Sequence, residues 1–137
     1  MPMNVAHFIL YVSDQEASTA FYTRVLGLAP RLHVPGMTEF DLPGGAVLGL
    51  MPSAGIRKLL GDALPDPATG AGIPRAELYL VVDDASSWHQ RSLAAGARPL
   101  GPVEARDWGQ AAGYSLDPDG HVLAFAQAGD MGAPDDA

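Results

Sequence analysis

Hydrophobic and polar residues alternate in two segments of the chain, and an amphipathic stretch follows each segment. The first alternating segment runs from Asn4 to Val12, and the second runs from Ala76 to Val82. Alternation combined with β-branched and aromatic residues predicts a strand in each segment. Aspartate follows both segments, and a glycine, Gly27 or Gly96, ends each amphipathic stretch. Because aspartate caps helix N-termini and glycine ends helices, we expect a helix after each strand.

The two halves of the chain repeat one pattern. The segment HFILYVSD, residues 7–14, aligns with ELYLVVDD, residues 77–84. Further on, FDLPGGAVLGL, residues 40–50, aligns with YSLDPDGHVLAF, residues 114–125, if the second copy has an extra turn residue. Such self-similarity is the sequence signature of a repeated structural unit. Each copy therefore contains a strand, a helix and three further strands, which predicts an α+β fold with two βαβββ modules in tandem.

The predicted modules cover residues 4–52 and 76–127 of a single domain that spans residues 1–137. Residues 53–75 are rich in glycine and proline and are expected to form a linker, and residues 128–137 a flexible acidic tail. With 137 residues, of which 47% are hydrophobic and 18% charged, the chain has the composition of one folded domain. A chain of this length buries a sufficient core without a structural metal.

Composition excludes several classes of function. The chain has no cysteine, so it has no disulfide framework, iron–sulfur cluster, thiolate zinc site or cysteine nucleophile. Its formal charge of −8 argues against nucleic acid as a partner, because phosphate contacts require a basic face. No apolar run is long enough for a membrane helix, and the N-terminus lacks the basic region of a signal peptide. We therefore expect a cytoplasmic protein that does not bind a membrane.

Three segments carry a family resemblance: HFILYVSD at residues 7–14, FYTRVLGL at residues 21–28 and WGQAAGYSLDPDGHVLAF at residues 108–125. With them, the chain resembles the vicinal-oxygen-chelate superfamily, which includes glyoxalase I, extradiol dioxygenases, fosfomycin-resistance enzymes and bleomycin-resistance proteins. The resemblance covers residues 4–127. It implies that the two modules form a curved eight-stranded mixed sheet around a cup, and that the protein is a homodimer.

The same resemblance locates the positions that bind a metal in the metal-dependent members. The first-strand positions are His7 and Glu77, and the last-strand positions are Gly49 and Ala124. Glycine and alanine have no donor atom, so only a degenerate half-site of two ligands remains, whereas catalytic sites normally have at least three. The expectation is a protein without a cofactor, with a weakly bound divalent metal as the alternative. Neighbouring strands carry four further donors, namely His33, Glu39, Asp41 and His121.

Strand alternation then predicts which residues line the cup. The predicted ligand-binding residues are His7, Ile9, Tyr11, Val47, Gly49, Met51, Glu77, Tyr79, Trp108, Val122 and Ala124. This lining is aromatic at the rim and small at the floor, which suits a sizeable apolar or planar ligand. The opposite faces carry a continuous apolar set, including Phe8, that the two helices are expected to cover. Trp88 and His89 lie on the second predicted helix and are expected to pack against the sheet.

The leading hypothesis is a small-molecule binding protein that sequesters an aromatic or apolar ligand, such as a hydrophobic or cationic drug, and so confers antibiotic resistance. The alternative is a lyase or isomerase similar to glyoxalase I, in which His7, Glu77 and a third donor hold a divalent metal. In a third hypothesis, His7 and Glu77 form a metal-free acid/base pair. These two residues could equally form a structural ion pair.

Overall fold

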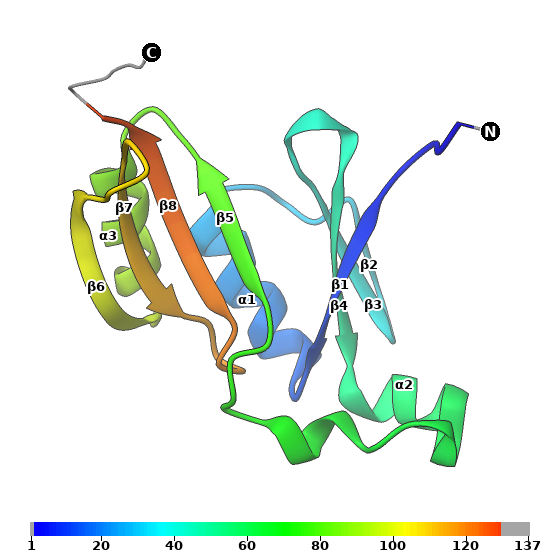
Figure 1. Ribbon diagram of the computed structural model, residues 1–137. Helices are drawn as coiled ribbons and strands as arrows, with labels where there is room; N and C mark the ends of the chain where they lie inside the picture. The colour runs from blue at the N-terminus through cyan, green and yellow to red at the C-terminus, as the bar shows by residue number, and fades with distance from the viewer. Residues whose placement is uncertain (1, 130–137) are drawn as a thin grey trace. The chain divides into compact units, whose positions relative to one another are not determined.

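The computed structural model describes residues 2–129, which form two compact units, one up to Ala71 and one from Gly72 onward. Each unit contains a four-stranded mixed sheet with the connectivity βαβββ (Figure 1). The prediction of an α+β fold with two tandem βαβββ modules is therefore confirmed. The structure defines each unit on its own. The cup that the two units were expected to share therefore stays a prediction.

The first module has the strand order β1-β4-β3-β2, in which β1 is parallel to β4 and the other pairs are antiparallel. Its elements are β1 (His7–Val12), α1 (Gln15–Leu26), β2 (Leu32–Val34), β3 (Met37–Asp41), a short 3₁₀ turn (Pro43–Gly45) and β4 (Val47–Pro52). The helix begins where the sequence predicts, because the Asp14 side chain accepts a hydrogen bond from the amide of Ala17 at 3.0 Å. It ends at Gly27, whose φ of 67° is the left-handed conformation that glycine adopts without strain.

The second module repeats this topology with the strand order β5-β8-β7-β6, and β5 is parallel to β8. Its elements are β5 (Glu77–Val81), α3 (Ala85–Ala94), β6 (Arg98–Ala105), β7 (Gln110–Leu116) and β8 (Val122–Ala128). Helix α2 (Ser53–Leu60) and two 3₁₀ turns (Gly61–Ala63 and Pro67–Gly70) occupy most of the predicted linker. Strand β8 includes Ala128, the first residue of the expected tail, and residues 130–137 of that tail lie outside the described residues.

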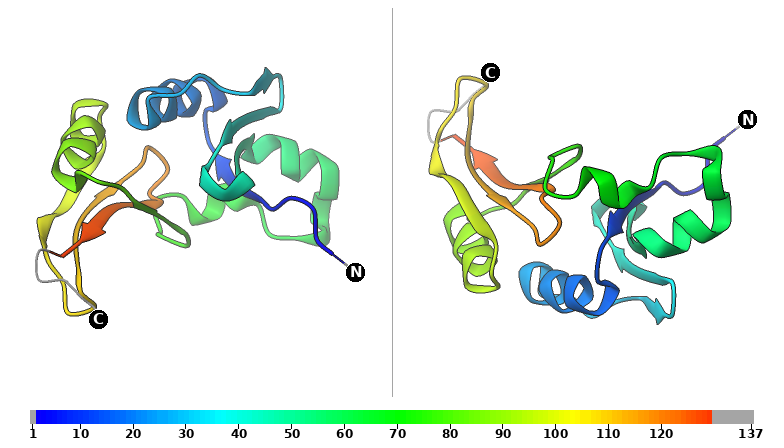
Figure 2. Two further views of the ribbon diagram at one scale, coloured as in Figure 1. Left: turned by 90° about the horizontal axis from the view of Figure 1, so that it is seen from above. Right: turned by 90° about the horizontal axis from the view of Figure 1, so that it is seen from below.

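One face of each sheet packs against a helix to form a core (Figure 2). In the first module, α1 contacts β3 and β4, so that Phe21 and Val25 are buried together with Phe40, Leu48 and Leu50. In the second module, the Trp88 ring of α3 stacks on Phe125 of β8, with centroids 5.5 Å apart. Trp88 and His89 therefore pack against the sheet, as the sequence predicts.

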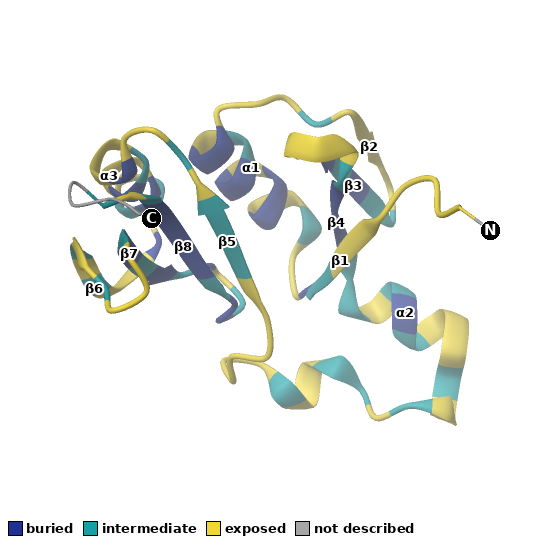
Figure 3. Cartoon of the chain, turned by 45° about the horizontal axis from the view of Figure 1, so that its top comes forward, coloured by how far each residue is buried: buried dark blue, intermediate teal, exposed yellow. Residues whose placement is uncertain are grey.

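The expected helix cover is wrong at Phe8. This residue is 62% exposed, although alternation places it on the same face as the buried Val12. The physical reason is that β1 is an edge strand of its sheet, while α1 packs on β3 and β4. Figure 3 shows the outcome as a buried β4 next to a β1 whose first half is exposed.

The side chain of Gln15, at the start of α1, forms hydrogen bonds to the β2–β3 hairpin. The Gln15 amide nitrogen donates to the carbonyl oxygen of Val34 at 2.8 Å and to the Thr38 hydroxyl at 3.0 Å. Its amide oxygen accepts from the backbone N–H of Gly36 at 3.0 Å. Thr38 is fully buried, so removing its partner leaves a buried hydroxyl with fewer hydrogen bonds.

Gln15→Ala is therefore expected to lower the free energy of unfolding by about 1–3 kcal/mol. Urea denaturation followed by circular dichroism measures the change. Glu16→Ala is the matched control, because the neighbouring Glu16 is exposed and forms only a surface pair with His33, worth less than about 1 kcal/mol. Equal losses for both variants would contradict the assigned role of Gln15.

Candidate functional site

In the first module, the six predicted ligand-binding residues lie on one sheet face. The parallel register of β1 and β4 pairs His7 with Val47, Ile9 with Gly49, and Tyr11 with Met51. Partners in such a register project to the same side, so alternation brings these six residues together within the module. Strand β3 adds Glu39 to this face, because Glu39 pairs with Gly49 from the other side.

Two side chains close the space above Gly49. A Cβ atom built on Gly49 would lie 3.0 Å from Cγ1 of Ile9 and 3.2 Å from Sδ of Met37. The sequence predicts an enlarged floor at this position because the glycine has no side chain. The structure corrects that expectation in the first module, since the long side chains of Ile9 and Met37 reach over the glycine and occupy the room.

A chain of charged groups crosses the same face. Oε2 of Glu39 lies 3.4 Å from Nδ1 of His7, and Oε1 lies 3.3 Å from Nε of Arg31. Arg31 also contacts Asp41, with Nη1 and Oδ1 at 3.1 Å. The Glu39 side chain is only 14% exposed, so its charge is balanced locally by Arg31. Glu39 is thus the carboxylate that partners His7 within the first module, whereas the sequence pointed to Glu77.

In the second module, Ala124 lies between two tyrosines. It pairs with Tyr79 of β5 on one side and with Tyr114 of β7 on the other, and it is fully buried. All three residues therefore share one face of the sheet. Val122 lies on the same face and pairs with Glu77. The position where the family resemblance implies a metal ligand thus has an aromatic ring on each side of a methyl group.

Trp108 extends this pair of rings. Its Nε1–H donates a hydrogen bond to the Tyr79 hydroxyl at 3.0 Å, and that hydroxyl donates to Oε1 of Gln110. The indole remains 54% exposed. We call Tyr79, Trp108 and Tyr114 the aromatic platform. Gln110 and Trp108 immobilise the Tyr79 ring, so the platform is positioned before any ligand arrives.

Two charges act on the platform. The Arg106 guanidinium carbon lies 5.2 Å from the centre of the Tyr114 ring, within the range of a cation–π contact. Nε and Nη2 of Arg106 donate to the carbonyl oxygen of Ala112 at 3.0 and 2.8 Å, which fixes the guanidinium there. Burial raises the pKa of Tyr114, and the negative charge of Glu77 raises it further. Glu77 therefore contributes negative potential to the platform.

The structure assigns other partners to several candidate metal donors. Nε2 of His33 lies 2.9 Å from Oε2 of Glu16. Nδ1 of the buried His121 lies 3.0 Å from Oδ2 of Asp117, in the turn before β8. Within residues 2–129, no group of three or more histidine, aspartate or glutamate side chains is arranged to hold a metal ion.

Sequence reasoning missed Met37, Arg106, Gln110 and Tyr114 as residues of these faces. The signal for Gln110 and Tyr114 was present, because positions 110, 112 and 114 alternate on β7 toward the same side. No sequence signal indicated Arg106, because a turn residue has no strand alternation to orient it.

Within the described part of the chain, no helix is both long and apolar enough to cross a membrane.

Replacing Glu77 with glutamine is expected to lower the pKa of Tyr114, because the variant removes a negative charge that disfavours the phenolate. Phenolate absorbance during an alkaline titration measures this shift. The Tyr114→Phe variant identifies which of the four tyrosines in the chain contributes the high-pH component. An unchanged titration of Tyr114 in Glu77→Gln would show that Glu77 exerts no field at the platform.

A family model matches most of the chain. The model described as "Glyoxalase/Bleomycin resistance protein/Dioxygenase superfamily" matches residues 4–125. Among the curated proteins, the chain is 28% identical over 127 residues to "Uncharacterized protein Rv0887c" of Mycobacterium tuberculosis, and the match covers 86% of this chain and 71% of that protein.

Solved structures show the same fold. A glyoxalase-related enzyme from Fulvimarina pelagi is 28% identical and superposes with a TM-score of 0.78, over 96% of each chain. A lactoylglutathione lyase from Agrobacterium tumefaciens is 25% identical, with a TM-score of 0.68 over 93% of this chain and 95% of that one.

Proposed function

The chain belongs to the glyoxalase/bleomycin resistance protein/dioxygenase superfamily, and from this premise we propose that it is a metal-free small-molecule binding protein for an aromatic or apolar ligand. The observation that carries the proposal is the position of Ala124, which offers no donor atom and lies between Tyr79 and Tyr114. The protein acts by sequestration, because a ligand held against the platform is withheld from its target. In this proposal it works in the cytoplasm and confers resistance to a drug.

The chemistry of the platform favours a planar ligand. Each stacked aromatic pair contributes about 0.5–1.5 kcal/mol beyond the burial of apolar area. The Trp108 ring is exposed and can stack on such a ligand, while its hydrogen bond to Tyr79 keeps it in place and Gln110 holds Tyr79. Glu77 and the net charge of −8 favour a cationic or weakly basic ligand over an anionic one.

The donor set in the first module does not fit a catalytic metal. His7 and Glu39 are two donors, and Arg31 contacts the same carboxylate that would have to bind the ion. Gly49 adds no donor, and the side chains of Ile9 and Met37 occupy the space above it. A catalytic zinc-type site needs three protein ligands and an open position. The proposed binding function therefore uses no cofactor.

A metal-dependent lyase or isomerase is the second candidate. The observation in its favour is Glu39, which places a carboxylate 3.4 Å from His7 on the strand next to Gly49. The structural similarity to a lactoylglutathione lyase points in the same direction. This candidate requires that the carboxylate leave Arg31 and that a third ligand join His7 and Glu39.

Binding to the platform is expected to quench the fluorescence of Trp108. A panel of planar aromatic antibiotics, cationic and anionic, is titrated against the protein with and without EDTA. We expect saturable quenching by the cationic members, unchanged by EDTA and lost in Trp108→Phe. The remaining signal in that variant comes from Trp88, the other of the two tryptophans, which belongs to α3 and stacks on Phe125 on the opposite face of the sheet.

Two outcomes would contradict this function. One is the absence of quenching across the whole panel. The other is one equivalent of divalent metal per chain in protein purified without chelator, abolished by His7→Ala, which would favour the metal-dependent enzyme instead. Elemental analysis of the wild type and of Leu59→Ala, an exposed position on α2 whose side chain carries no donor atom, provides the baseline.

We also propose that the protein is a homodimer. Strands β1 and β5 are edge strands, and both present apolar side chains to solvent, including Phe8, Ile9 and Val81. Exposed apolar edges of this kind favour pairing with another chain.

Light scattering coupled to size-exclusion chromatography is expected to give twice the mass of one chain, 14.3 kDa. Phe8→Lys places a charge on the exposed β1 edge and is expected to shift the protein toward monomer. Leu59→Lys, at another exposed apolar position on α2, is the matched control and should leave the mass unchanged. A wild-type protein that runs as a monomer at all concentrations would exclude the dimer.

A further inference from the structure

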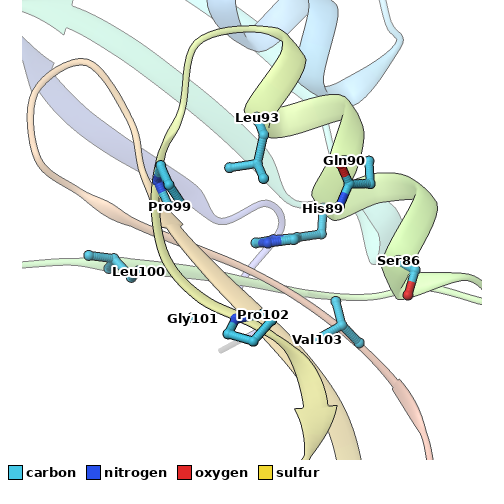
Figure 4. Close-up of a pocket in the computed structure, with 9 residues that line it drawn as sticks. All are labelled: Ser86, His89, Gln90, Leu93, Pro99, Leu100, Gly101, Pro102 and Val103. Carbon is cyan, nitrogen blue, oxygen red and sulfur yellow. The ribbon is translucent and has the colours of Figure 1, made fainter.

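A pocket lies in the second module, between α3 and β6 (Figure 4). Its volume is about 430 Å³, within the range of small-molecule sites. Its lining residues are Ser86, His89, Gln90, Leu93, Pro99, Leu100, Gly101, Pro102 and Val103. We call this the α3 cavity. It faces away from the aromatic platform, because Gly113 of β7 points toward His89 while the adjacent Tyr114 points to the other side.

Irregular pairing of β6 opens this cavity. The register between β6 and β7 shifts twice, between Pro99 and Gly101 and again between Gly101 and Glu104. Proline cannot donate a ladder hydrogen bond, so Pro99 and Pro102 interrupt the edge strand. Gly113 then lets the imidazole approach the sheet, since a Cβ atom there would lie 2.9 Å from Nδ1 of His89. The chain thus keeps a gap beneath α3 that regular strands would close.

Two buried polar atoms beside this gap have no hydrogen-bond partner among the described residues, namely Nδ1 of His89 and Oγ of Ser115. His89 is only 4% exposed, and Figure 4 shows its ring extending from α3 toward β6. Ser115 is fully buried and pairs with Pro99, which lines the cavity. Such atoms are rare in folded proteins, and Nδ1 lies against Gly113 of the sheet, so Nε2 is the ring nitrogen of His89 that can meet a ligand.

The lining restricts the chemistry of a ligand. None of its residues is acidic or basic at neutral pH apart from the imidazole, and burial lowers the pKa of His89 and so favours the neutral ring. Nδ1 is enclosed against Gly113, and a buried N–H without an acceptor is less tolerable than a buried lone pair. The neutral ring therefore carries its proton on Nε2, which is left to donate toward the cavity. Leucine, proline and valine side chains supply apolar walls.

We propose that the α3 cavity is a binding site for a small uncharged molecule with an apolar ring and one hydrogen-bonding oxygen, which accepts from His89. This site is separate from the platform and does not depend on the function proposed above. A phenol has the required chemistry, whereas benzoate and benzylamine carry the same ring with a negative or positive charge that the lining cannot balance.

The experiment titrates the isotope-labelled full chain with phenol, benzoate and benzylamine and follows backbone amides and histidine imidazoles by NMR. Phenol is expected to produce saturable shifts at Leu93, Val103 and the His89 ring. His89→Phe keeps the ring volume but removes the donor, and it should weaken phenol binding by about tenfold, the typical effect of one lost hydrogen bond. Benzoate and benzylamine should bind at least about tenfold more weakly than phenol.

A second variant keeps the test decisive if His89→Phe does not fold. Gln90 is exposed at the rim, so Gln90→Trp is expected to block the cavity and abolish the phenol shifts without disturbing the core. Ala94→Trp, on an exposed part of α3 outside the lining, is the matched control and should bind like the wild type. The proposal is overturned if phenol gives no saturable shifts, if Gln90→Trp and Ala94→Trp behave alike, or if the shifts map to Tyr79 and Tyr114.

Discussion

The pairing of β8 with both of its neighbours is the constraint on which the second module depends. Because β5 and β7 flank β8 in register, Ala124 is enclosed between Tyr79 and Tyr114 on one face. The same pairing places Phe125 on the other face, where Trp88 stacks on it. The platform and the helix-covered core are therefore two consequences of one register. A slip of one residue would exchange the two faces and destroy both.

The two modules use the equivalent sheet face differently, although their topology is the same. In the first module, Ile9 and Met37 fill the space above Gly49, and an ionic chain through Glu39 and Arg31 occupies the neighbouring strands. In the second, tyrosines flank Ala124. The equivalent face is thus charged and filled by side chains in the first module, and aromatic in the second. This divergence supports a function based on stacking in the second module over one based on a shared set of metal ligands.

Much of the fold could be predicted because its signals are local. The N-cap at Asp14, the glycine that ends α1 and the repeat of strand, helix and three strands all depend on neighbours close in sequence. Alternation also identified which residues of β1, β4, β5 and β8 share a face. It could not identify the partner of His7, because Glu39 reaches it across β4 only after three strands have paired. The exposure of Phe8 depends on which strands a helix covers.

The sequence by itself determined the periodic features, namely the duplicated module and the strand faces. Both follow from side-chain identity and a repeat of two along a strand, which needs no knowledge of distant contacts. The absence of donor atoms at the expected ligand positions 49 and 124 came from the sequence together with the family resemblance. Only the tertiary structure decided what occupies the space beside those positions, how Trp108 meets Tyr79, and that an irregular β6 leaves a cavity next to an unsatisfied His89. These depend on register, bulges and the reach of long side chains, which sequence periodicity does not encode.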